Sequence, residues 1–247
     1  VADLKSALSL DKEDGIISDT SIVAMFSTQG GSGKTTIAYS TALAATGQGC
    51  RTVYLNFEEV SSENQMHSHV YKGQVEKLIY KLNENADISS VLLETLEADE
   101  NGVYTLPPFR SVEDVLSLSK KSIEYLIDSL VRTGNAKYIF VDLPTGFHSI
   151  TMNVLEYATS IVQVYGDTLQ GREKLKKTME DIYYTSLPLS GKRITVLNGA
   201  KTPDDEPGID VKFPISNSLR EGRMISEIEE KNPLYLGRCN RLLEIIR

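Results

Sequence analysis

The sequence predicts an α/β fold in three layers, with a mostly parallel central sheet and helices on both of its faces. Segments that are apolar throughout alternate along the chain with segments of helical spacing. This alternation is typical of parallel strands joined by right-handed helical crossovers. The length of 247 residues, 40% of them hydrophobic, suits one large domain and is too short for two comfortable ones.

Strands are expected where short apolar runs end at turn residues. The first run stops at a glycine cluster, and the third ends in a Pro-Pro loop. The predicted strands span residues 21–27, 51–57, 103–107, 137–143, 160–166 and 193–198.

Helices are expected between these strands, where apolar residues recur every three or four positions. Small residues at 34–47 allow that helix to pack closely on the sheet, and Gly47 and Gly49 mark its end. Further helices are predicted at 70–85, 169–182 and 235–247. The segment 111–133 is predicted as one long helix with a single apolar stripe, formed by Val112, Val115, Leu116, Ile123, Leu126, Ile127 and Leu130.

The chain divides into a short first segment and one folded domain. Residues 1–19 are polar and irregular and begin with Val rather than Met, so we interpret them as a linker or as the remnant of an upstream domain. Residues 20–247 are predicted to form the folded domain. No run approaches the ~18 apolar residues of a membrane-spanning helix, so we expect a soluble, cytoplasmic protein. Cys50 and Cys239 lie in no paired motif, which favours reduced packing residues.

The segment FSTQGGSGKTT lies between the first predicted strand and the first predicted helix. Its glycines allow positive φ and turn backbone N–H groups inward, and the helix N-terminus adds positive charge, so the segment suits phosphate. Lys34 would reach the β and γ phosphates of ATP, and the Thr35 hydroxyl would bind Mg²⁺. The predicted nucleotide-binding residues are Gln29, Gly30, Gly31, Ser32, Gly33, Lys34, Thr35 and Thr36. The alternative is a glycine-rich turn whose lysine points to solvent.

This phosphate loop departs from the common GxxxxGK[ST] pattern, because Thr28 stands where the first glycine belongs. It resembles instead the deviant KGGxGK[ST] form of the MinD/ParA superfamily of P-loop ATPases. In that family a signature lysine precedes the glycine pair and crosses a dimer interface to the phosphates of the partner. Gln29 takes that position here. Its amide can hydrogen-bond a phosphate oxygen but brings no charge to the transition state.

The segment KYIFVDLPTGF resembles the Walker B and switch II pattern of the same family. The resemblance implies that Asp142 binds Mg²⁺ through water and that the loop at residues 143–146 senses the γ phosphate. Lys34 and Asp142 would therefore carry the chemistry, and Thr35 and Asp142 would hold the metal. The alternative for Asp142 is a carboxylate that only caps a strand or helix end.

The end of the second predicted strand also departs from the family. Relatives usually have an Asp-x-Asp element there, whose first Asp orients the attacking water, whereas this chain has Asn56, Phe57 and Glu58. Asn56 cannot act as a base. Glu58 has two possible interpretations at this point, as an ordinary surface carboxylate or as part of a switch. With Gln29 and Asn56 at these positions, we expect ATP hydrolysis to be slow or absent.

Two later segments take part in the resemblance, which covers residues 20–247. Asn198 ends the predicted strand at 193–198, where the resemblance implies an Asn that reads the adenine edge, although an Asn-Gly turn is the simple alternative. The FPI segment at 213–215 resembles a late Pro-containing strand that lies near the base.

Within the superfamily, the segments FSTQGGSGKTTIA, TLPPFRSVEDVLSLS and VDLPTGF are similar to the CpaE/TadZ pilus-assembly ATPases. Many of these carry a receiver-like domain upstream, which would fit residues 1–19 as a remnant. The resemblance implies a homodimer with ATP at its interface. This dimer would act as a localisation factor that marks a site for a pilus or secretion machine, at a cell pole or at the inner membrane face.

Several alternatives stay open at this point. A ParA-type partition ATPase would bind DNA when ATP-bound, although the net charge of −8 gives no strong DNA signal. A P-loop protein kinase is disfavoured because the 12 tyrosines are scattered. The basic cluster in 169–182 is either a solvated helix face or a docking patch. The helix at 235–247 either packs in the core or makes a peripheral membrane contact.

Overall fold

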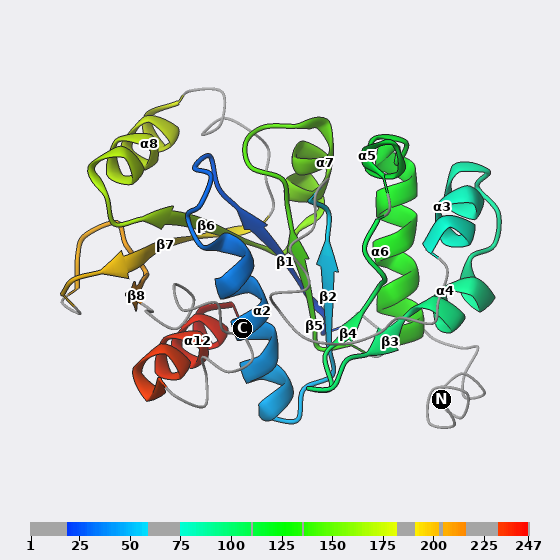
Figure 1. Ribbon diagram of the computed structural model, residues 1–247, viewed down its shortest axis with the longest axis horizontal. Coiled ribbons are helices and arrows are strands. Elements are labelled where there is room, and N and C mark those ends of the chain that lie inside the picture. The colour runs from blue at the N-terminus through cyan, green and yellow to red at the C-terminus, as the bar shows by residue number, and fades with distance from the viewer. Residues whose placement is uncertain are drawn as a thin grey trace.

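The computed structural model describes residues 19–58, 75–109, 111–134, 136–181, 191–202, 205–215 and 232–246. In these segments, strands form one sheet in the order β3-β4-β2-β5-β1-β6-β7-β8 (Figure 1). The strands are β1 (Ser21–Phe26), β2 (Thr52–Asn56), β3 (Glu97–Ala98), β4 (Tyr104–Thr105), β5 (Tyr138–Asp142), β6 (Ser160–Gly166), β7 (Lys192–Ala200) and β8 (Val211–Pro214).

Neighbouring strands of the described sheet run parallel, with the exception of the short antiparallel pair of β3 and β4. The prediction of a mostly parallel sheet is therefore confirmed. The carboxyl ends of parallel strands meet at one edge of a sheet, so loops that are distant in sequence come together there. In this chain the loops that follow β1, β2, β5, β6 and β7 share that edge.

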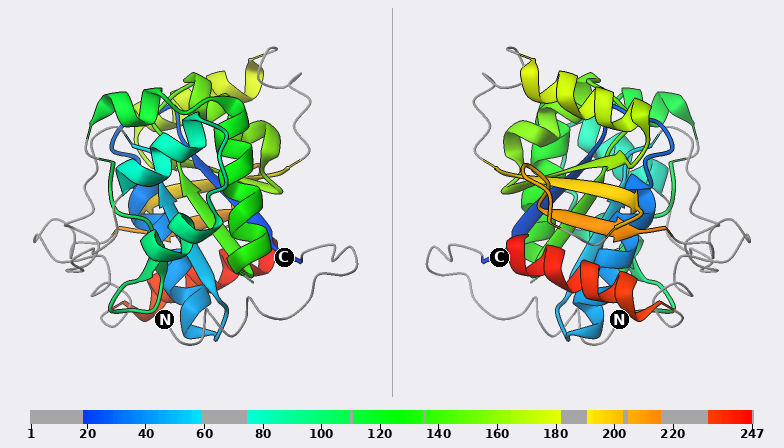
Figure 2. Two further views of the ribbon diagram at one scale, coloured as in Figure 1. Left: turned by 90° about the vertical axis from the view of Figure 1, so that its right-hand side faces the viewer. Right: turned by 90° about the vertical axis from the view of Figure 1, so that its left-hand side faces the viewer.

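Helices cover both faces of the sheet, which confirms the three-layer prediction (Figures 1 and 2). Residues of α2 and α12 pack against one face, and residues of α3, α4, α6 and α7 pack against the other. The helices are α2 (Lys34–Gly47), α3 (Val75–Asn83), α4 (Ser89–Thr95), α5 (Val112–Leu116), α6 (Lys120–Gly134), α7 (Ser149–Tyr157), α8 (Leu169–Glu180) and α12 (Pro233–Ile246).

Strand β1 shows why the central strands are apolar throughout. Ala24 and Phe26 belong to the core on one side of the sheet, whereas Val23 and Met25 belong to the core on the other side. All four side chains are fully buried. Successive residues of a strand point to opposite faces, and both faces of this sheet are covered by helices. Every central position of the strand is therefore buried and carries an apolar side chain.

The single helix predicted at 111–133 is wrong, because the structure has two helices there, α5 and α6. Helix α5 ends at Leu116. The Ser119 hydroxyl then accepts a hydrogen bond from the Ser122 N–H at 3.1 Å, and this side-chain bond caps the start of α6. As a result Val112 and Leu116, which were expected on the buried stripe, are 44% and 68% exposed. The buried members of the predicted stripe are Val115, Ile123, Leu126, Ile127 and Leu130.

Other elements differ less from the expectation. The predictions did not include α4, α7 and β3. The strand expected at 103–107 is reduced to two residues, because the two prolines that follow cannot donate ladder hydrogen bonds. The predicted helix at 70–85 is observed as α3, and its residues 70–74 lie outside the described segments, as do residues 1–18 and residue 182.

The last helix packs in the core, which confirms one of the two interpretations of that segment. It begins at Pro233, and proline is well suited to the first turn of a helix. Tyr235, Cys239, Leu242 and Leu243 are buried against the sheet and α2. Within the described segments, no helix combines the length and the apolar character that crossing a bilayer requires.

Candidate functional site: a phosphate loop beside a buried carboxylate

The loop between β1 and α2 has the backbone shape that the glycine pattern predicts, with one difference. Gly31 and Gly33 have φ of 68° and 84°, a region in which other residues are strained. A Cβ on Gly33 would also lie 2.1 Å from Asn198 Nδ2, so a larger residue would be strained in its backbone and would displace the Asn198 carboxamide. Gly30 does not have a positive φ, and the expectation for that glycine is wrong.

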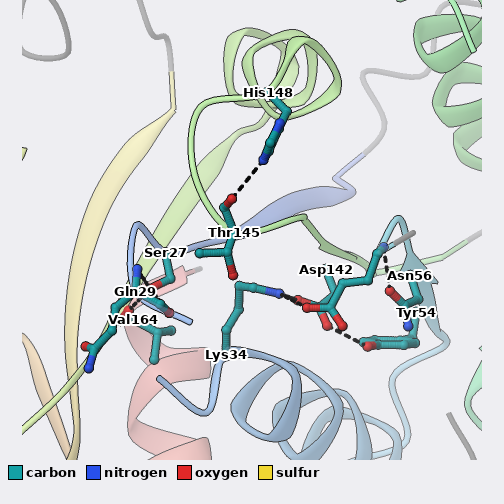
Figure 3. A network of polar contacts seen from close by, with 10 residues as sticks. Ser27, Gln29, Lys34, Tyr54, Asn56, Asp142, Thr145, His148 and Val164 are labelled. Atoms are coloured by element: carbon teal, nitrogen blue, oxygen red, sulfur yellow. Dashed lines mark hydrogen bonds and ion pairs between the residues drawn. The ribbon is translucent and has the colours of Figure 1, made fainter. Parts of the chain in front are cut away.

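Lys34 is the first residue of α2, and its side chain points inward (Figure 3). Only 4% of Lys34 is exposed. Its Nζ lies 3.1 Å from Glu58 Oε1 and forms an ion pair with Asp142 Oδ1. The alternative of a solvent-pointing lysine is therefore wrong.

Asp142 ends β5 and is completely buried. One carboxylate oxygen faces Lys34, and the other accepts a hydrogen bond of 3.0 Å from the Tyr54 hydroxyl. The sequence did not point to Tyr54, because it lies inside an apolar strand with no polar motif around it. The two oxygens of Asp142 thus bind a cation and a hydroxyl, so the carboxylate does more than cap a strand end.

Lys34, Glu58 and Asp142, which we term the Lys34 cluster, contain two carboxylates and one ammonium. Burial acts to lower the pKa of Lys34, but the attraction of Asp142 and then of Glu58 outweighs it and raises this pKa above its ordinary value. Burial raises the pKa of Glu58, and repulsion from Asp142 adds to this, while the attraction of Lys34 opposes it. The cluster therefore has more negative than positive charge, which is unfavourable in a buried place.

Glu58 enters the site through the pairing of β2 with β5, in which Asn56 is the register partner of Asp142. The Asn56 Oδ1 accepts a hydrogen bond of 2.9 Å from the Glu58 N–H, which fixes the turn after the strand. Glu58 is therefore not an ordinary surface carboxylate. The available signal was its position two residues beyond the end of a strand, at the edge where a parallel sheet places its functional loops.

A hollow of about 150 Å³ opens at this cluster. This is below the volume of pockets that enclose a whole drug-sized ligand, roughly 300–1,000 Å³, and suits the phosphate end of a larger molecule. Four of the predicted site residues do not line it: Gly30, Thr36, Asp142 and Asn198. The lining residues are Gln29, Gly31, Ser32, Gly33, Lys34, Thr35, Glu58 and Thr145.

The residues of the hollow, together with Asp142, which is paired with Lys34, fit a magnesium-bound phosphate. Mg²⁺ prefers oxygen ligands and is usually held by one or two carboxylates together with substrate phosphates and water. Thr35 and Asp142 supply such oxygens, and Lys34 supplies a cation for phosphate. Among the described residues, no group of three or more His, Cys, Asp or Glu side chains could hold a metal ion by itself, so phosphate oxygens would have to complete the coordination.

The loop at residues 143–146 is attached to the phosphate loop, as a switch segment would be. The Gly146 N–H donates to the Ser27 carbonyl at 2.8 Å, and Thr145 lines the hollow. The His148 ring nitrogen is 2.9 Å from the Thr145 carbonyl oxygen (Figure 3). His67 and His69 lie outside the described residues.

Asn198 lies against the phosphate loop, at the carboxyl end of β7. Its Nδ2 donates to the Ser32 carbonyl at 2.9 Å. Two residues that the sequence separates widely are thus brought together at the start of α2. The Pro-containing segment expected at 213–215 is observed as β8, which pairs with β7 and ends at Pro214.

Gln29 lies on the rim of the hollow, but its carboxamide extends away from Lys34 (Figure 3). The Gln29 Oε1 accepts a hydrogen bond of 2.9 Å from the Gly166 N–H at the end of β6. Only 9% of Gln29 is exposed. The side chain is therefore bound within the chain rather than directed to the phosphate position.

The basic cluster predicted on the helix at 169–182 is observed on α8. All four cations have partners, in the pairs Arg172 with Asp167 and Glu206, Lys174 with the Thr28 carbonyl, Lys176 with Glu180, and Lys177 with Glu173. Exposed pairs of this kind contribute little energy and leave little net charge. The arrangement favours the solvated helix face over a docking patch.

Comparisons with known proteins show which family model and which solved structures this chain resembles. The model of an AAA domain family (AAA_31) matches residues 20–189, which is more than half of the chain. No curated protein sequence matches the chain. Solved structures do match, and the ParA family ATPase from Chlorobium tepidum TLS superposes with a TM-score of 0.73 at 16% identity, covering 92% of this chain and 99% of that one.

Two further structures have a similar fold. The septum site-determining protein MinD from Pyrococcus horikoshii OT3, complexed with Mg-ADP, has a TM-score of 0.66 at 16% identity, covering 92% of this chain and 99% of that one. The MinC:MinD cell division protein complex of Aquifex aeolicus has a TM-score of 0.66 at 15% identity, with 91% and 96% covered. The chain therefore belongs to the AAA domain family and has the fold of the ParA and MinD ATPases.

Proposed function

We propose that this chain binds Mg-ATP at the hollow and that bound ATP joins two copies face to face. The observation that carries the proposal is the buried Lys34 at the start of α2, beside Glu58 and Asp142. The backbone of the phosphate loop and Lys34 would hold the phosphates. Thr35 and Asp142 would hold the magnesium, which neutralises phosphate charge. Asn198 would contact the adenine.

The charges of the Lys34 cluster support the binding of a nucleotide together with its metal. Lys34 is shared between two carboxylates, and the raised pKa of Glu58 reflects burial together with repulsion from Asp142. A metal ion close to Asp142 would supply the missing positive charge, and Lys34 would then be available for phosphate oxygens. Phosphate and metal would therefore bind together rather than separately.

We expect turnover to be slow. Gln29 brings no positive charge, and its carboxamide is bonded to Gly166. Asn56 cannot take a proton, and it is hydrogen-bonded to the Glu58 backbone. Glu58 is the carboxylate beside the hollow that can orient an attacking water. A nucleotide that is hydrolysed slowly acts mainly as a ligand that shifts an equilibrium between one copy and two.

The cellular role that we propose is that of a localisation factor for a pilus or secretion machine. It is supported by the similarity of three segments to the CpaE/TadZ proteins and by the MinD relative, which assembles with MinC. In this proposal residues 20–247 form the ATPase domain, and residues 1–19 connect it to an upstream domain. The protein would act in the cytoplasm and be recruited to a cell pole or to the inner membrane face.

The molar mass in solution, measured by light scattering with and without Mg-ATP, tests the proposal. We expect Mg-ATP to convert a monomer into a dimer that persists for hours, and we expect the Lys34→Ala variant to remain monomeric. Lys192→Ala is the matched control. Lys192 lies at the opposite end of β7 from the phosphate loop, so this variant should dimerise like the wild type.

Other outcomes have a clear meaning. A mass that Mg-ATP leaves unchanged in the wild type would contradict the proposed switch. A change that also occurs in Lys34→Ala would contradict the assigned site. If DNA added to the same samples joins the dimer only with ATP, and high salt releases it, the partition role would replace the pilus role.

A further inference from the structure

Gln29 occupies a notch between two glycines of its own chain. Its Oε1 accepts from the Gly166 N–H at 2.9 Å. A Cβ on Gly166 would lie 3.3 Å from Gln29 Nε2. A Cβ on Gly171 would lie 2.0 Å from the Gly166 carbonyl oxygen and 2.6 Å from Gln29 Oε1. Gly166 ends β6 and Gly171 lies in the first turn of α8. Both glycines therefore leave the space that the carboxamide fills.

Thr28, the residue before Gln29, makes two further contacts with α8. The Lys174 Nζ donates to the Thr28 carbonyl at 2.9 Å. The hydroxyls of Thr28 and Thr178 are 3.3 Å apart. Lys174 and Thr178 are one turn apart on the same helix, and Thr178 is buried. Both residues thus hold the beginning of the phosphate loop from the same side.

Ser27 completes this attachment from within the loop. Its hydroxyl donates to the Val164 carbonyl at 2.6 Å and accepts from the Gln29 N–H at 3.0 Å. Residues 27–29 are therefore bonded to β6 and α8, whereas Lys34, at the other end of the loop, is bonded to Asp142 of β5 and to Glu58, two residues beyond β2. Bonds within the chain therefore hold both ends of the phosphate loop without any ligand.

We propose that Gln29 is a positioning residue that acts within its own protomer. It holds the phosphate loop on the turn between β6 and α8 in the shape that receives phosphate, and it does not reach the nucleotide of a second copy. The proposal rests on the proposed nucleotide binding. A loop that is already ordered loses less conformational entropy when the ligand binds, so nucleotide affinity in the monomer depends on this contact.

The surroundings of Gln29 support a role within one protomer. To reach across an interface, the carboxamide would have to give up its bond to the partly buried Gly166 N–H, and losing an intramolecular hydrogen bond is unfavourable. The notch between Gly166 and Gly171 would also lose the group that fills it. A residue that contacts a second copy directs its polar end away from its own chain, whereas the Gln29 Oε1 is bonded to Gly166 of the same protomer.

The test measures the affinity for a fluorescent ADP analogue, mant-ADP with Mg²⁺, at a protein concentration where light scattering shows a monomer. Gln29→Met keeps the side-chain length and removes the acceptor, and Lys174→Met removes the second contact. We expect each to weaken binding by about 3- to 10-fold, the equivalent of one hydrogen bond. Because both side chains hold the same segment, the affinity of the double variant should fall by less than the product of the two single fold-changes.

Lys176→Met is the matched control, because Lys176 lies on the same helix and its ammonium is 3.9 Å from Glu180, away from the loop. This variant should bind like the wild type. Melting temperatures without nucleotide are measured in parallel. The positioning role requires the affinity to fall while the melting temperature of Gln29→Met stays close to that of the wild type.

Three results would overturn the inference. One is an unchanged monomer affinity in Gln29→Met, above all if ATP-dependent dimerisation alone is lost, since that would assign Gln29 to the partner's nucleotide. Another is a loss of affinity that follows the melting temperature and adds fully to that of Lys174→Met, which indicates general destabilisation. The third is a wild type that does not bind mant-ADP. Only this result would contradict the proposed nucleotide site as well.

Discussion

Asp142 and Asp99 are both buried carboxylates beside α2, but their partners differ in kind. Asp142 is bound by the ammonium of Lys34 and by the Tyr54 hydroxyl. Asp99 accepts from the Tyr39 hydroxyl and from the N–H groups of Asn101 at 2.8 Å and Val103 at 3.0 Å. All of these donors of Asp99 are neutral. We term Tyr39, Asp99 and Asn101 the Asp99 cluster.

The difference indicates which cluster serves structure and which serves a ligand. The donors of Asp99 are backbone groups of its own turn and a phenol, and burial together with the hydrogen bond to Asp99 raises the pKa of Tyr39 far above its ordinary range. That hydroxyl therefore stays protonated and keeps donating. The Lys34 cluster instead borders an open hollow and has an excess of carboxylates. A satisfied buried group stabilises the fold, whereas an unbalanced one beside a hollow suits a charged ligand.

Replacing Asp99 by Ala should have the largest effect on stability and none on the nucleotide site. The change leaves the Tyr39 hydroxyl and two backbone N–H groups without their acceptor. We expect the free energy of unfolding to fall by about 3 kcal/mol, since each unsatisfied buried group costs about 1–3 kcal/mol and some will find water. Urea denaturation without nucleotide measures this loss, and mant-ADP binding measures the site.

Glu94→Ala is the control for that experiment. The Glu94 side chain is 68% exposed, and its Oε2 lies 3.7 Å from the Lys77 Nζ in a surface ion pair, which contributes little to stability. It should change stability by a few tenths of a kcal/mol at most. Two results for Asp99→Ala would contradict the structural role. One is a fall in the free energy of unfolding below about 1 kcal/mol, and the other is a weaker affinity for mant-ADP without any loss of stability.

Tyr54 touches both clusters, and Tyr54→Phe should have an intermediate effect. Its ring packs edge-on against Tyr39 at 5.6 Å between centroids, and its hydroxyl donates to Asp142. Losing only the hydroxyl should lower the free energy of unfolding by about 1–2 kcal/mol, as expected for a hydrogen bond to a charged group. The exposed Tyr80 provides the control Tyr80→Phe. Equal urea midpoints for the two variants would mean that the Asp142 bond contributes nothing.

Glu58→Gln should have the smallest effect on stability, and the effect should have the opposite sign. The pKa of Glu58 is raised in the folded protein, so the folded state binds this proton more tightly than the unfolded state does. Stability from this group is present below the unfolded pKa of about 4.3 and is lost as the pH rises through the raised value. Near pH 7.5 the variant should therefore be more stable than the wild type, by less than about 1 kcal/mol because the group is partly exposed.

Urea denaturation at several pH values checks this prediction by measuring the difference in the free energy of unfolding between Glu58→Gln and the wild type. This difference should shrink as the pH falls, because the protonated glutamate then resembles glutamine. Any remaining ATP hydrolysis should fall in the same variant if Glu58 orients water. A variant that is less stable than the wild type at pH 7.5 would show that the attraction of Lys34 outweighs burial and the repulsion from Asp142.

Local patterns in the sequence were enough for the alternation of strands and helices and for the phosphate loop. The glycine spacing, the lysine after it and the apolar strand that ends in Asp142 are short-range features, because backbone sterics and strand periodicity act over a few residues. The same reasoning failed at 111–133. There the apolar stripe continued, but one helix ends at Leu116 and the Ser119 side chain, bonded to the Ser122 N–H, caps the start of another.

The tertiary structure alone decided which side chains meet. Glu58 reaches the hollow because β2 pairs with β5, and Gln29 turns inward because β6 and α8 leave a notch between two glycines. Neither fact follows from residue type, since a glutamate after a strand and a glutamine in a loop are ordinarily exposed. The sequence by itself determined the fold class and the phosphate loop, which depend on local spacing. Strand order and packing decided the charge balance of the site, because electrostatic interactions depend on distances in space that the chain order does not contain.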